Sequence, residues 1–242
     1  MAKISKHGGS GGPDAGKRQL FIRVKTAKKR TLSSQKWLER QLNDPYVIAA
    51  KREGWRSRAA FKLIELDDKL RFLRPGQRVV DLGAAPGGWA LVAAQRVTSL
   101  EGKGQVVAID ISEMEAIPGV EILHMDFMIE SAPGELVSRL RDGRADIVLS
   151  DMAAPASGHT GTDHMRIMGM AETAGAFAAE VLAPGGCFVA KVLQGGTEKD
   201  LLVQLKRDFT TVRHIKPPAS RSDSAELYVV ATGFRGSGEA HS

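Results

Sequence analysis

Two things are scarce in this sequence, cysteine and long apolar segments, and each scarcity excludes a class of protein. The 242 residues include one cysteine, Cys187. A single cysteine excludes an intramolecular disulfide and a zinc site built from cysteines alone, and it suits a reducing compartment. No stretch approaches the roughly 20 consecutive apolar residues of a membrane-spanning helix, and the first residues lack the apolar core of an export signal. We therefore expect a cytoplasmic protein with no membrane partner.

Positive charge is concentrated in the N-terminal third of the chain. Residues 1–74 hold 19 Lys and Arg against 7 Asp and Glu, whereas residues 75–242 hold 15 against 21. Such an excess at one end indicates attraction to a polyanion, and nucleic acid is favoured over a membrane because no amphipathic apolar face accompanies the charge. A tail that only increases solubility is the alternative explanation.

The chain divides into two tails and one domain. Residues 1–31 combine Gly/Ser spacers with a basic cluster and show no sustained periodicity, so we expect a disordered tail there until a partner binds. Residues 235–242 form a short C-terminal tail. The remaining residues, 32–234, are predicted to form one α/β domain that begins with RNA-binding helices over residues 32–74.

Three helices are predicted before the first strand. The first begins at Ser33 or Ser34 and stops at the Asn-Asp-Pro sequence that follows it, and a second, shorter helix ends at Gly54. Ser57 is expected to cap a third helix that carries an apolar stripe. Lys62 lies away from the centre of that stripe, so its side chain is free to point elsewhere.

Seven short β-branched runs follow, and they predict a sheet. The first five are separated by segments long enough for crossover helices, which is typical of a parallel, doubly wound sheet. The segment between the last two is too short for a crossover, so we expect an antiparallel hairpin at the sheet edge. The predicted strands are residues 78–82, 106–111, 120–127, 145–151, 187–193, 210–217 and 226–234.

The strongest local signal is the sequence DLGAAPGGW at residues 81–89, directly after the first predicted strand. Glycines there let the backbone approach a ligand closely, and ligands of doubly wound sheets bind outside the carboxyl ends of the strands. The turn lacks the G-x-G-x-x-G spacing, which argues against a dinucleotide. Asp110, Asp126 and Asp151 end the next three strands, so together they predict a cleft for an adenosine that carries a positive centre. Any one of them alone is as easily a helix N-cap.

Five motifs in this order resemble the FtsJ/RrmJ (RlmE) family of ribosomal RNA ribose 2′-O-methyltransferases. The resemblance runs from about Ser34 to Gly233 and implies the Rossmann-like fold of class I methyltransferases, with S-adenosylmethionine as the methyl donor. The motifs are RAAFKL from Arg58, VVDLGAAPGGW from Val79, SDMA from Ser150, FVAKV from Phe188 followed by Gln194-Gly195, and ELYVVA from Glu226.

The resemblance also implies site residues and partners. It implies a catalytic tetrad of Lys62, Asp151, Lys191 and Glu226. It implies cofactor contacts at Gly87, Trp89, Asp110, Asp126 and Asp151. The implied substrate is a uridine of large-subunit ribosomal RNA, presented by the assembled large ribosomal subunit, and we expect a monomer.

The residue types of the tetrad suit methyl transfer to a hydroxyl. The enzyme must align the nucleophile with a sulfonium methyl and take up a proton whose pKa in water is far above neutral. A lysine beside another cation in a partly desolvated cleft has a lowered pKa and can act as a base. We expect Lys191 to be that base and Lys62 to repel it and steer the hydroxyl. Asp151 would orient Lys191, and Glu226 would hold the lysines or the ribose.

Other methyl-transfer chemistries fit less well. Pyrimidine C5 methylation needs a cysteine nucleophile, and Cys187 lies in a run expected to be a buried strand. Amine methylation usually has an aromatic residue after strand four, where this chain has Met152 and Ala153. Ala154 and Pro155 replace the Pro-Asn of many family members, which alters the loop. His159, Asp163 and His164 are interpreted as solvated loop residues, so no metal is expected.

RNA binding is expected to use basic residues for phosphates and aromatic residues for stacking. The candidates are Lys25, Lys28, Lys29, Arg30, Lys51, Arg52, Arg56 and Arg58, with Trp37, Tyr46 and Trp55, although Trp37 is more readily explained as an anchor for its helix. Two alternatives stay open. One is a 2′-O-methyltransferase of tRNA or another RNA, and the other is a ribosome-assembly factor that has the fold without the catalysis.

Overall fold

The structure is a computed structural model that describes residues 31–154, 157–195 and 199–236. The chain divides into two compact units, residues 1–54 and residues 55–242. Nearly all of the predicted N-terminal tail, most of the predicted C-terminal tail and Pro155 lie outside the described residues. Within the described residues, no helix is long and apolar enough to cross a membrane.

The first unit contains two short helices. Helix α1 (Leu32–Leu42) begins earlier than predicted, because the Thr31 hydroxyl, in place of Ser33 or Ser34, caps it by accepting a hydrogen bond from the Ser34 amide at 3.3 Å. Helix α2 (Pro45–Glu53) is capped by Asp44, and it ends, as predicted, at Gly54, which is in the left-handed conformation.

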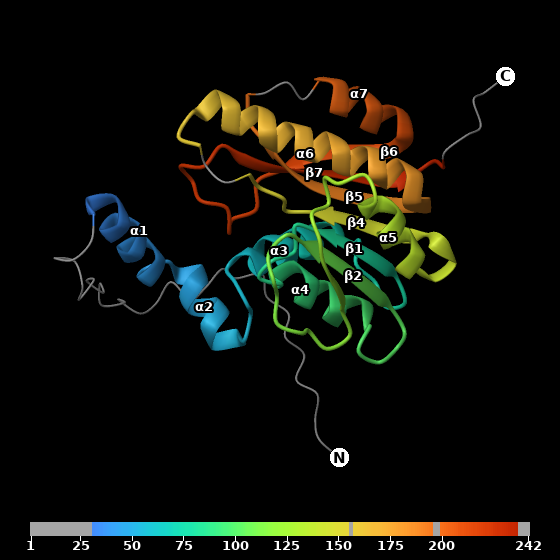
Figure 1. The fold of residues 1–242 in the computed structure, drawn as a ribbon, viewed down its shortest axis with the longest axis horizontal. Helices are drawn as coiled ribbons and strands as arrows, with labels where there is room; N and C mark the ends of the chain where they lie inside the picture. The colour runs from blue at the N-terminus through green and yellow to red at the C-terminus, as the bar shows by residue number, and fades with distance from the viewer. Residues whose placement is uncertain (1–30, 155–156, 196–198, 237–242) are drawn as a thin grey trace, which may run out of the picture. The chain divides into compact units, whose positions relative to one another are not determined.

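The second unit is built on a seven-stranded sheet (Figure 1). The order β3-β2-β1-β4-β5-β7-β6 confirms the predicted fold class, because the first five strands are parallel and the last two form an antiparallel pair at one edge. The strands are β1 (Arg78–Leu82), β2 (Gln105–Asp110), β3 (Glu121–His124), β4 (Ala145–Ser150), β5 (Leu182–Leu193), β6 (Phe209–Ile215) and β7 (Glu226–Phe234). The second strand of the hairpin, β7, pairs with β5, so β7 lies between β5 and the edge strand β6.

Helices cover both faces of this sheet and make three layers. Helices α3 (Ala59–Leu70) and α4 (Gly88–Val97) pack on one face, where Leu63, Leu66 and Val92 join a buried cluster with alternate strand residues. The other face is covered by α5 (Ala132–Arg139), α6 (Thr160–Val181) and α7 (Lys199–Asp208), which contribute to a larger cluster. A 3-10 turn, η2 (Arg141–Gly143), precedes β4. Both faces are therefore buried, which explains the nearly continuous apolar runs of the parallel strands.

Two further local predictions are wrong. Residues 111–120, all of which the structure describes, contain no helix, so β2 and β3 are joined by an irregular connection in place of the expected crossover helix. Pro118 and Gly119 interrupt any helical pattern there. Ser57 does not cap α3, because the amides of Ala60 and Phe61 bond to backbone carbonyls at 3.2 Å and close the first turn without a side chain.

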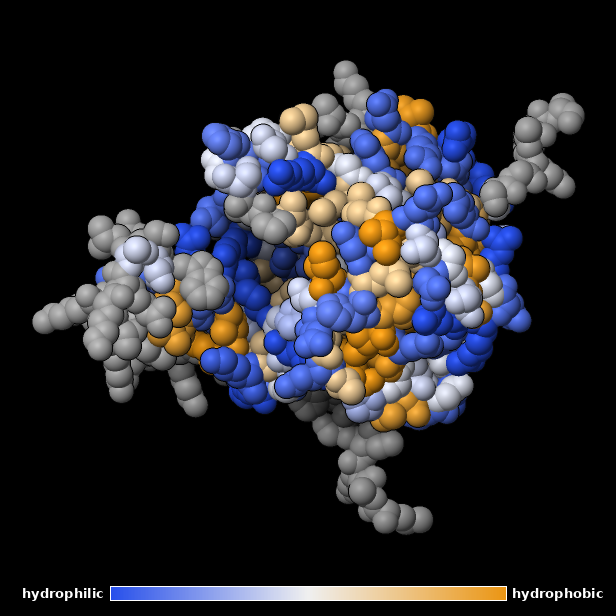
Figure 2. Space-filling model, in the orientation of Figure 1, coloured by the Kyte–Doolittle hydropathy of each residue, from blue (hydrophilic) through white to orange (hydrophobic). Residues whose placement is uncertain are grey.

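Hydrophilic residues cover most of the visible face of the sheet unit, interrupted by apolar residues over the loops beside β2 (Figure 2). The exposed apolar side chains in those loops include Leu100 and Ile111. Such scattered apolar exposure is ordinary for a folded surface and does not by itself indicate a binding site. In doubly wound sheets ligands bind at the carboxyl ends of the strands, so those ends are the better candidate.

Candidate active site

A cleft of about 340 Å³ opens at the carboxyl ends of the central strands. Its walls come from the turn after β1, the end of β2, the segment after β3 and the segment after β4. The residues that line it are Gly83, Ala85, Ile109, Asp110, Ile111, Ser112, Asp126, Phe127, Met128, Asp151, Met152, Ala153 and Met170. The cleft mixes apolar walls with three carboxylates, which fits a nucleoside that carries a positive charge.

The turn after β1 requires glycine at two positions. Gly83 and Gly87 both have positive φ angles, +73° and +100°. A Cβ on Gly83 would lie 2.6 Å from the side chain of Met152, and a Cβ on Gly87 would lie 2.6 Å from Ile117. A larger residue would therefore push the turn away from its neighbours and change the shape of the cleft.

The carboxylates at the ends of β2 and after β3 are held by backbone amides. Asp110 accepts hydrogen bonds from the amide of Ala85 at 2.9 Å and from the amide of Ser112 at 2.7 Å. Asp126 accepts one from the amide of Met128 at 2.9 Å. A carboxylate has about four acceptor positions, so each keeps capacity for ligand hydroxyl groups. The structure thus brings Asp110, Asp126 and Asp151 to one cleft.

Trp89 lies elsewhere. Its side chain is buried in the cluster beneath α3 and α4, and its indole N–H donates to the carbonyl of Ala59 at 2.8 Å. Its ring centroid is 5.4 Å from that of Tyr228. Only the backbone of Trp89, at the start of α4, remains near the glycine turn, so a cofactor contact from this residue would come from main-chain atoms.

The four residues of the implied tetrad meet as two ion pairs. Lys191 Nζ lies 2.8 Å from Asp151 Oδ1 and also donates to the Asp151 carbonyl at 2.8 Å. Lys62 Nζ lies 2.7 Å from Glu226 Oε1. All four side chains are at most 18% exposed, so solvent screens the two pairs much less than it screens a surface salt bridge.

A fifth residue, which the sequence analysis missed, joins the two pairs. The hydroxyl of Tyr228 donates to Asp151 Oδ1 at 2.7 Å and accepts from Lys62 Nζ at 3.2 Å. Tyr228 is two residues after Glu226 on β7, so both side chains lie on the same face of that strand. That spacing was the signal in the sequence that could have found it.

Burial and charge shift the pKa values of three groups in this region. Burial alone would raise the pKa of Asp151, but the charges of Lys191 and Lys62 outweigh it and hold the pKa below its ordinary value. Burial, with the nearby charges of Asp151 and Glu226, raises the pKa of Tyr228 well above its ordinary value. Tyr228 therefore stays protonated and remains a donor to Asp151.

Asp81 is the third shifted group. Its carboxyl is fully buried on β1, and no described donor has hydrogen-bonding geometry to it, although the amide of Ala90 is close enough to lower its pKa slightly. Burial, with the charges of Asp151 and Asp110, raises the pKa of Asp81 to about 8. Asp81 is therefore largely neutral at neutral pH and adds little negative charge beneath the cleft.

Two arginines expected at RNA phosphates make internal contacts in the structure. Arg56 donates to the carbonyls of Glu115 and Ala116, and Arg58 donates to the carbonyl of Ala219 at 2.7 Å. Arg52 is exposed on α2 and pairs with its neighbour Glu53. Lys25 to Arg30 lie outside the described residues, as does the side chain of Trp37. Among the described residues, no three His, Cys, Asp or Glu side chains group as metal ligands.

The mostly parallel sheet, the glycine turn after β1 and the carboxylates at the strand ends define a class I, Rossmann-like methyltransferase. Residues 55–234 match the FtsJ-like methyltransferase family. The chain belongs to this family, whose members use S-adenosylmethionine as the methyl donor.

Named proteins and a solved structure are similar to this chain. The chain is 64% identical over 225 residues to the ribosomal RNA large subunit methyltransferase E of Xanthobacter autotrophicus, covering 93% of this chain and 87% of that protein. It is 60% identical over 248 residues to the protein of the same name from Parvibaculum lavamentivorans, covering 99% and 97%. A crystal structure of a ribosomal RNA methyltransferase from Plasmodium falciparum, 31% identical, superposes with a TM-score of 0.67 over 76% of this chain and 100% of that one.

Proposed function

We propose that this enzyme transfers a methyl group from S-adenosylmethionine to the ribose 2′-hydroxyl of a uridine in large-subunit (23S) ribosomal RNA, on the assembled large subunit. The observation that carries the proposal is the pair of lysines, each ion-paired to a carboxylate and joined through Tyr228, beside the cleft. The names of the relatives at 60–64% identity support the substrate. A ribosomal substrate also implies a cytoplasmic enzyme.

S-adenosylmethionine supplies the methyl group, activated by a sulfonium charge, and the cleft residues would hold it. Asp110 and Asp126, which line the cleft, would accept hydrogen bonds from ribose hydroxyls, and the apolar side chains of Ile111, Phe127 and Met128 would enclose the base. Asp151 lies in the same cleft and in the ion pair with Lys191, so it connects cofactor binding to the tetrad.

Lys191 is the proposed base. In the ion pair with Asp151 it is an ammonium, which would first release a proton to solvent. The free amine would then accept the proton of the 2′-hydroxyl while the oxygen attacks in line with the methyl group. The ammonium that forms would be stabilised by the carboxylate and the carbonyl of Asp151, both at 2.8 Å from Nζ. Asp151 thus plays the part of a fixed anion that offsets charge developing on its neighbour in the transition state.

Lys62 is proposed to steer the hydroxyl and to keep positive charge beside Lys191. Glu226 holds Lys62 by the ion pair at 2.7 Å and accepts a second hydrogen bond from the Ser220 hydroxyl at 2.9 Å. Because both partners of Glu226 come from other segments, α3 and the β6–β7 loop, its position is fixed from two directions. Lys62 is therefore held in one place instead of sampling the many rotamers of a surface lysine.

RNA would be recognised through its backbone. The exposed Lys51 and Arg52 of α2 are proposed to contact phosphates. A reaction at the 2′-hydroxyl selects RNA over DNA without any reading of the base, because DNA lacks that group. The selection of one uridine must come from the shape of the presented RNA.

The test is transfer of labelled methyl from S-adenosylmethionine to large ribosomal subunits, free ribosomal RNA and tRNA, followed by mapping of the labelled nucleotide. We expect label on a 2′-O-methyluridine of the large-subunit RNA. Lys191→Ala should lower the rate at least about 100-fold, as expected for loss of a general base. Lys69→Ala, an exposed lysine on the same helix as Lys62, is the matched control and should retain the wild-type rate.

Each other result would replace part of the proposal. Label on tRNA would keep the chemistry and change the substrate. No label on any RNA, with cofactor binding intact, would favour the assembly-factor alternative. Label on the same nucleotide at an undiminished rate with Lys191→Ala would remove Lys191 from the role of base.

A further inference from the structure

Arg56 connects two loops that are far apart in the sequence. Its Nη1 atom donates to the carbonyl of Glu115 at 2.8 Å and to the carbonyl of Pro86 at 3.5 Å, and its Nη2 atom donates to the carbonyl of Ala116 at 2.6 Å. Pro86 belongs to the glycine turn after β1. Glu115 and Ala116 belong to the irregular connection between β2 and β3. One side chain therefore ties both loops together.

These two loops form facing walls of the methyl-donor cleft. The glycine turn contributes Gly83 and Ala85 to the lining, and the connection begins with Ile111 and Ser112, which also line it. Asp110 bridges the same two segments on the cleft side, because its carboxylate accepts hydrogen bonds from the amides of Ala85 and Ser112. Arg56 makes the corresponding bridge farther along both loops.

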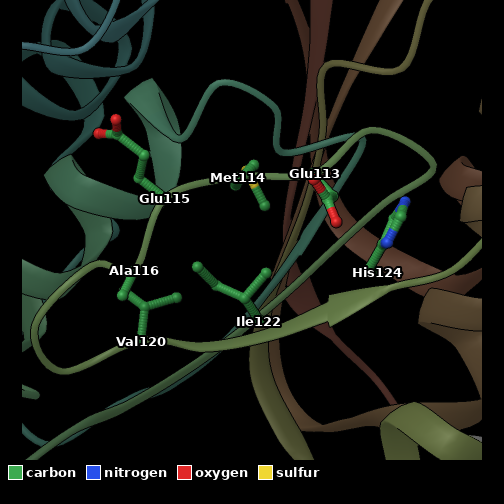
Figure 3. A pocket seen from close by; sticks show the side chains of 7 residues that line it. All are labelled: Glu113, Met114, Glu115, Ala116, Val120, Ile122 and His124. Atoms are coloured by element: carbon green, nitrogen blue, oxygen red, sulfur yellow. The ribbon is translucent and has the colours of Figure 1, made fainter.

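The connection between β2 and β3 is anchored in the core by Ile117, which packs with Ala84, Ala90 and Ala108. It contains no helix, and its outer side is hollowed by a pocket of about 770 Å³ (Figure 3). Figure 3 shows Glu113 and His124 at one end of this hollow and Ala116 with Val120 at the other. The start of the connection is held by His124, whose Nε2 atom lies 2.8 Å from the Ile111 carbonyl. Arg56 holds its middle.

The stem of Arg56 also packs against the glycine turn. A Cβ placed on Gly87 would lie 3.1 Å from Cδ of Arg56 and 2.6 Å from Cδ1 of Ile117. Gly87 is thus enclosed between the arginine stem and a buried residue of the connection. The turn can approach the connection this closely only while position 87 lacks a side chain.

The chemistry of the contact favours arginine over lysine. A guanidinium presents five N–H donors in a rigid plane, so it can serve carbonyls from two loops at once, whereas an ammonium on a flexible stem is a compact charge with three donors. Hydrogen bonds from a charged donor to carbonyls are stronger than those between neutral groups.

We propose that Arg56 is a positioning residue for methyl-donor binding: it braces the two walls of the cleft from outside and does not serve RNA phosphates. This inference rests on the methyltransferase assignment but not on which RNA is methylated. It predicts that S-adenosylmethionine affinity depends on Arg56, and that RNA affinity does not.

The experiment measures binding of S-adenosylmethionine by calorimetry and binding of ribosomal RNA at several salt concentrations, for Arg56→Ala, Arg56→Lys and Arg52→Ala. Arg56→Ala should weaken S-adenosylmethionine binding at least about 10-fold and leave RNA affinity and its salt slope unchanged. Arg56→Lys should fall between wild type and Arg56→Ala. Arg52→Ala removes an exposed charge and should show the reverse pattern, with weaker RNA binding and unchanged cofactor binding.

In steady-state assays, Arg56→Ala should raise KM for S-adenosylmethionine and leave kcat at saturation within about three-fold of wild type. Weaker RNA binding with a shallower salt slope and unchanged cofactor affinity would overturn the proposal in favour of a phosphate contact. A lower melting temperature with unchanged cofactor affinity in both Arg56 variants would overturn it in favour of a purely structural role. Because cofactor binding is measured without RNA, failure of the substrate assignment would leave this test intact.

Discussion

Lys191 and Tyr228 lie directly opposite each other on β5 and β7, and both bind the same oxygen of Asp151. The distances are 2.8 Å from Lys191 Nζ and 2.7 Å from the Tyr228 hydroxyl. Because β7 runs antiparallel to β5, this pairing also sets Glu226, two residues away on the same face, near Lys62 on α3. One register thus positions both ion pairs.

Tyr228→Phe removes the link between the two ion pairs and keeps the ring that packs on Trp89. The hydroxyl helps to lower the pKa of Asp151, so its loss should raise that pKa. We expect kcat to fall about 3- to 10-fold, less than with Lys191→Ala, since one hydrogen bond to a charged group is worth roughly 1.5–3 kcal/mol and water can replace part of it. The acidic limb of the pH–kcat profile should move to higher pH. An acidic limb that moves to lower pH would contradict the assigned link.

Much of this arrangement was predictable from the sequence, and the reasons differ between its parts. The alternation of short β-branched runs with helical segments gave the sheet and its edge hairpin, because burial on both faces leaves a strong pattern. The carboxylates at strand ends followed from the geometry of parallel sheets. The spacing of Tyr228 from Glu226 places both on one face of a strand, but Tyr228 was missed because that spacing does not distinguish a tyrosine that only packs from one that also forms hydrogen bonds.

The internal contacts of two arginines were missed for a different reason. Arg56 and Arg58 stand in a basic stretch, and local sequence cannot distinguish a cation that faces solvent from one that reaches a carbonyl far along the chain. The partners of Arg56 are 30, 59 and 60 residues away, and that of Arg58 is 161 residues away. Such contacts depend on loop conformations, and the connection after β2 was itself predicted to be a helix.

The Lys62–Glu226 pair should show strong coupling in a double-mutant cycle. Both side chains are nearly buried, at 11% and 15% exposure, so removing one partner leaves a poorly solvated charge. We expect Lys62→Met and Glu226→Gln each to lower the free energy of unfolding by roughly 3 kcal/mol, and the double variant to lose less than the sum. Urea unfolding measures this. Additive losses would mean that the two side chains act independently.

Asp81 should make the fold less stable as pH rises. Its pKa is about 8 in the folded protein, above the ordinary aspartate value of 3.8 expected in the unfolded chain, so the folded state binds the extra proton between these values. Stability from this group is fully present below pH 4 and is lost as pH rises through 8. Between pH 5.5 and 8 the loss should be at most about 3 kcal/mol.

Asp81→Asn provides the control for that dependence. The amide is nearly the same size and carries no titratable proton, so its own burial cost is the same at every pH. The variant should lose less stability than wild type when urea unfolding is repeated at pH 5.5 and pH 8. Equal losses in the two proteins would show that Asp81 does not titrate in this range.

Cys187 should be chemically silent in the folded enzyme. It is buried on β5, and burial, with the charge of Asp67, raises the pKa of its thiol, so the reactive thiolate is scarce. We expect no reaction with a thiol-specific reagent before unfolding and one equivalent after it. Cys187→Ala should retain methyl transfer, whereas a large loss of activity with the fold intact would revive a covalent mechanism.

The basic N-terminal segment should contribute affinity for RNA in a salt-dependent way. Residues 1–31 carry 9 Lys and Arg against 1 Asp, so their removal eliminates a large part of the positive charge. Each phosphate contact contributes roughly 0.7–0.9 to the slope of log affinity against log salt, because binding releases condensed counterions. Deletion of residues 1–31 should therefore weaken RNA binding at low salt and reduce this slope by several units.

A second variant separates charge from length in that test. Replacing the Lys and Arg of residues 1–31 with Gln keeps the segment and removes its charge, so it should reproduce the effect of the deletion on both affinity and slope. S-adenosylmethionine binding should stay at the wild-type value in both variants, since the cleft is built entirely from residues after Gly54. An unchanged slope in both variants would mean that the segment does not contact phosphates and only adds solubility, and the phosphate contacts would then have to come from the exposed cations of α2.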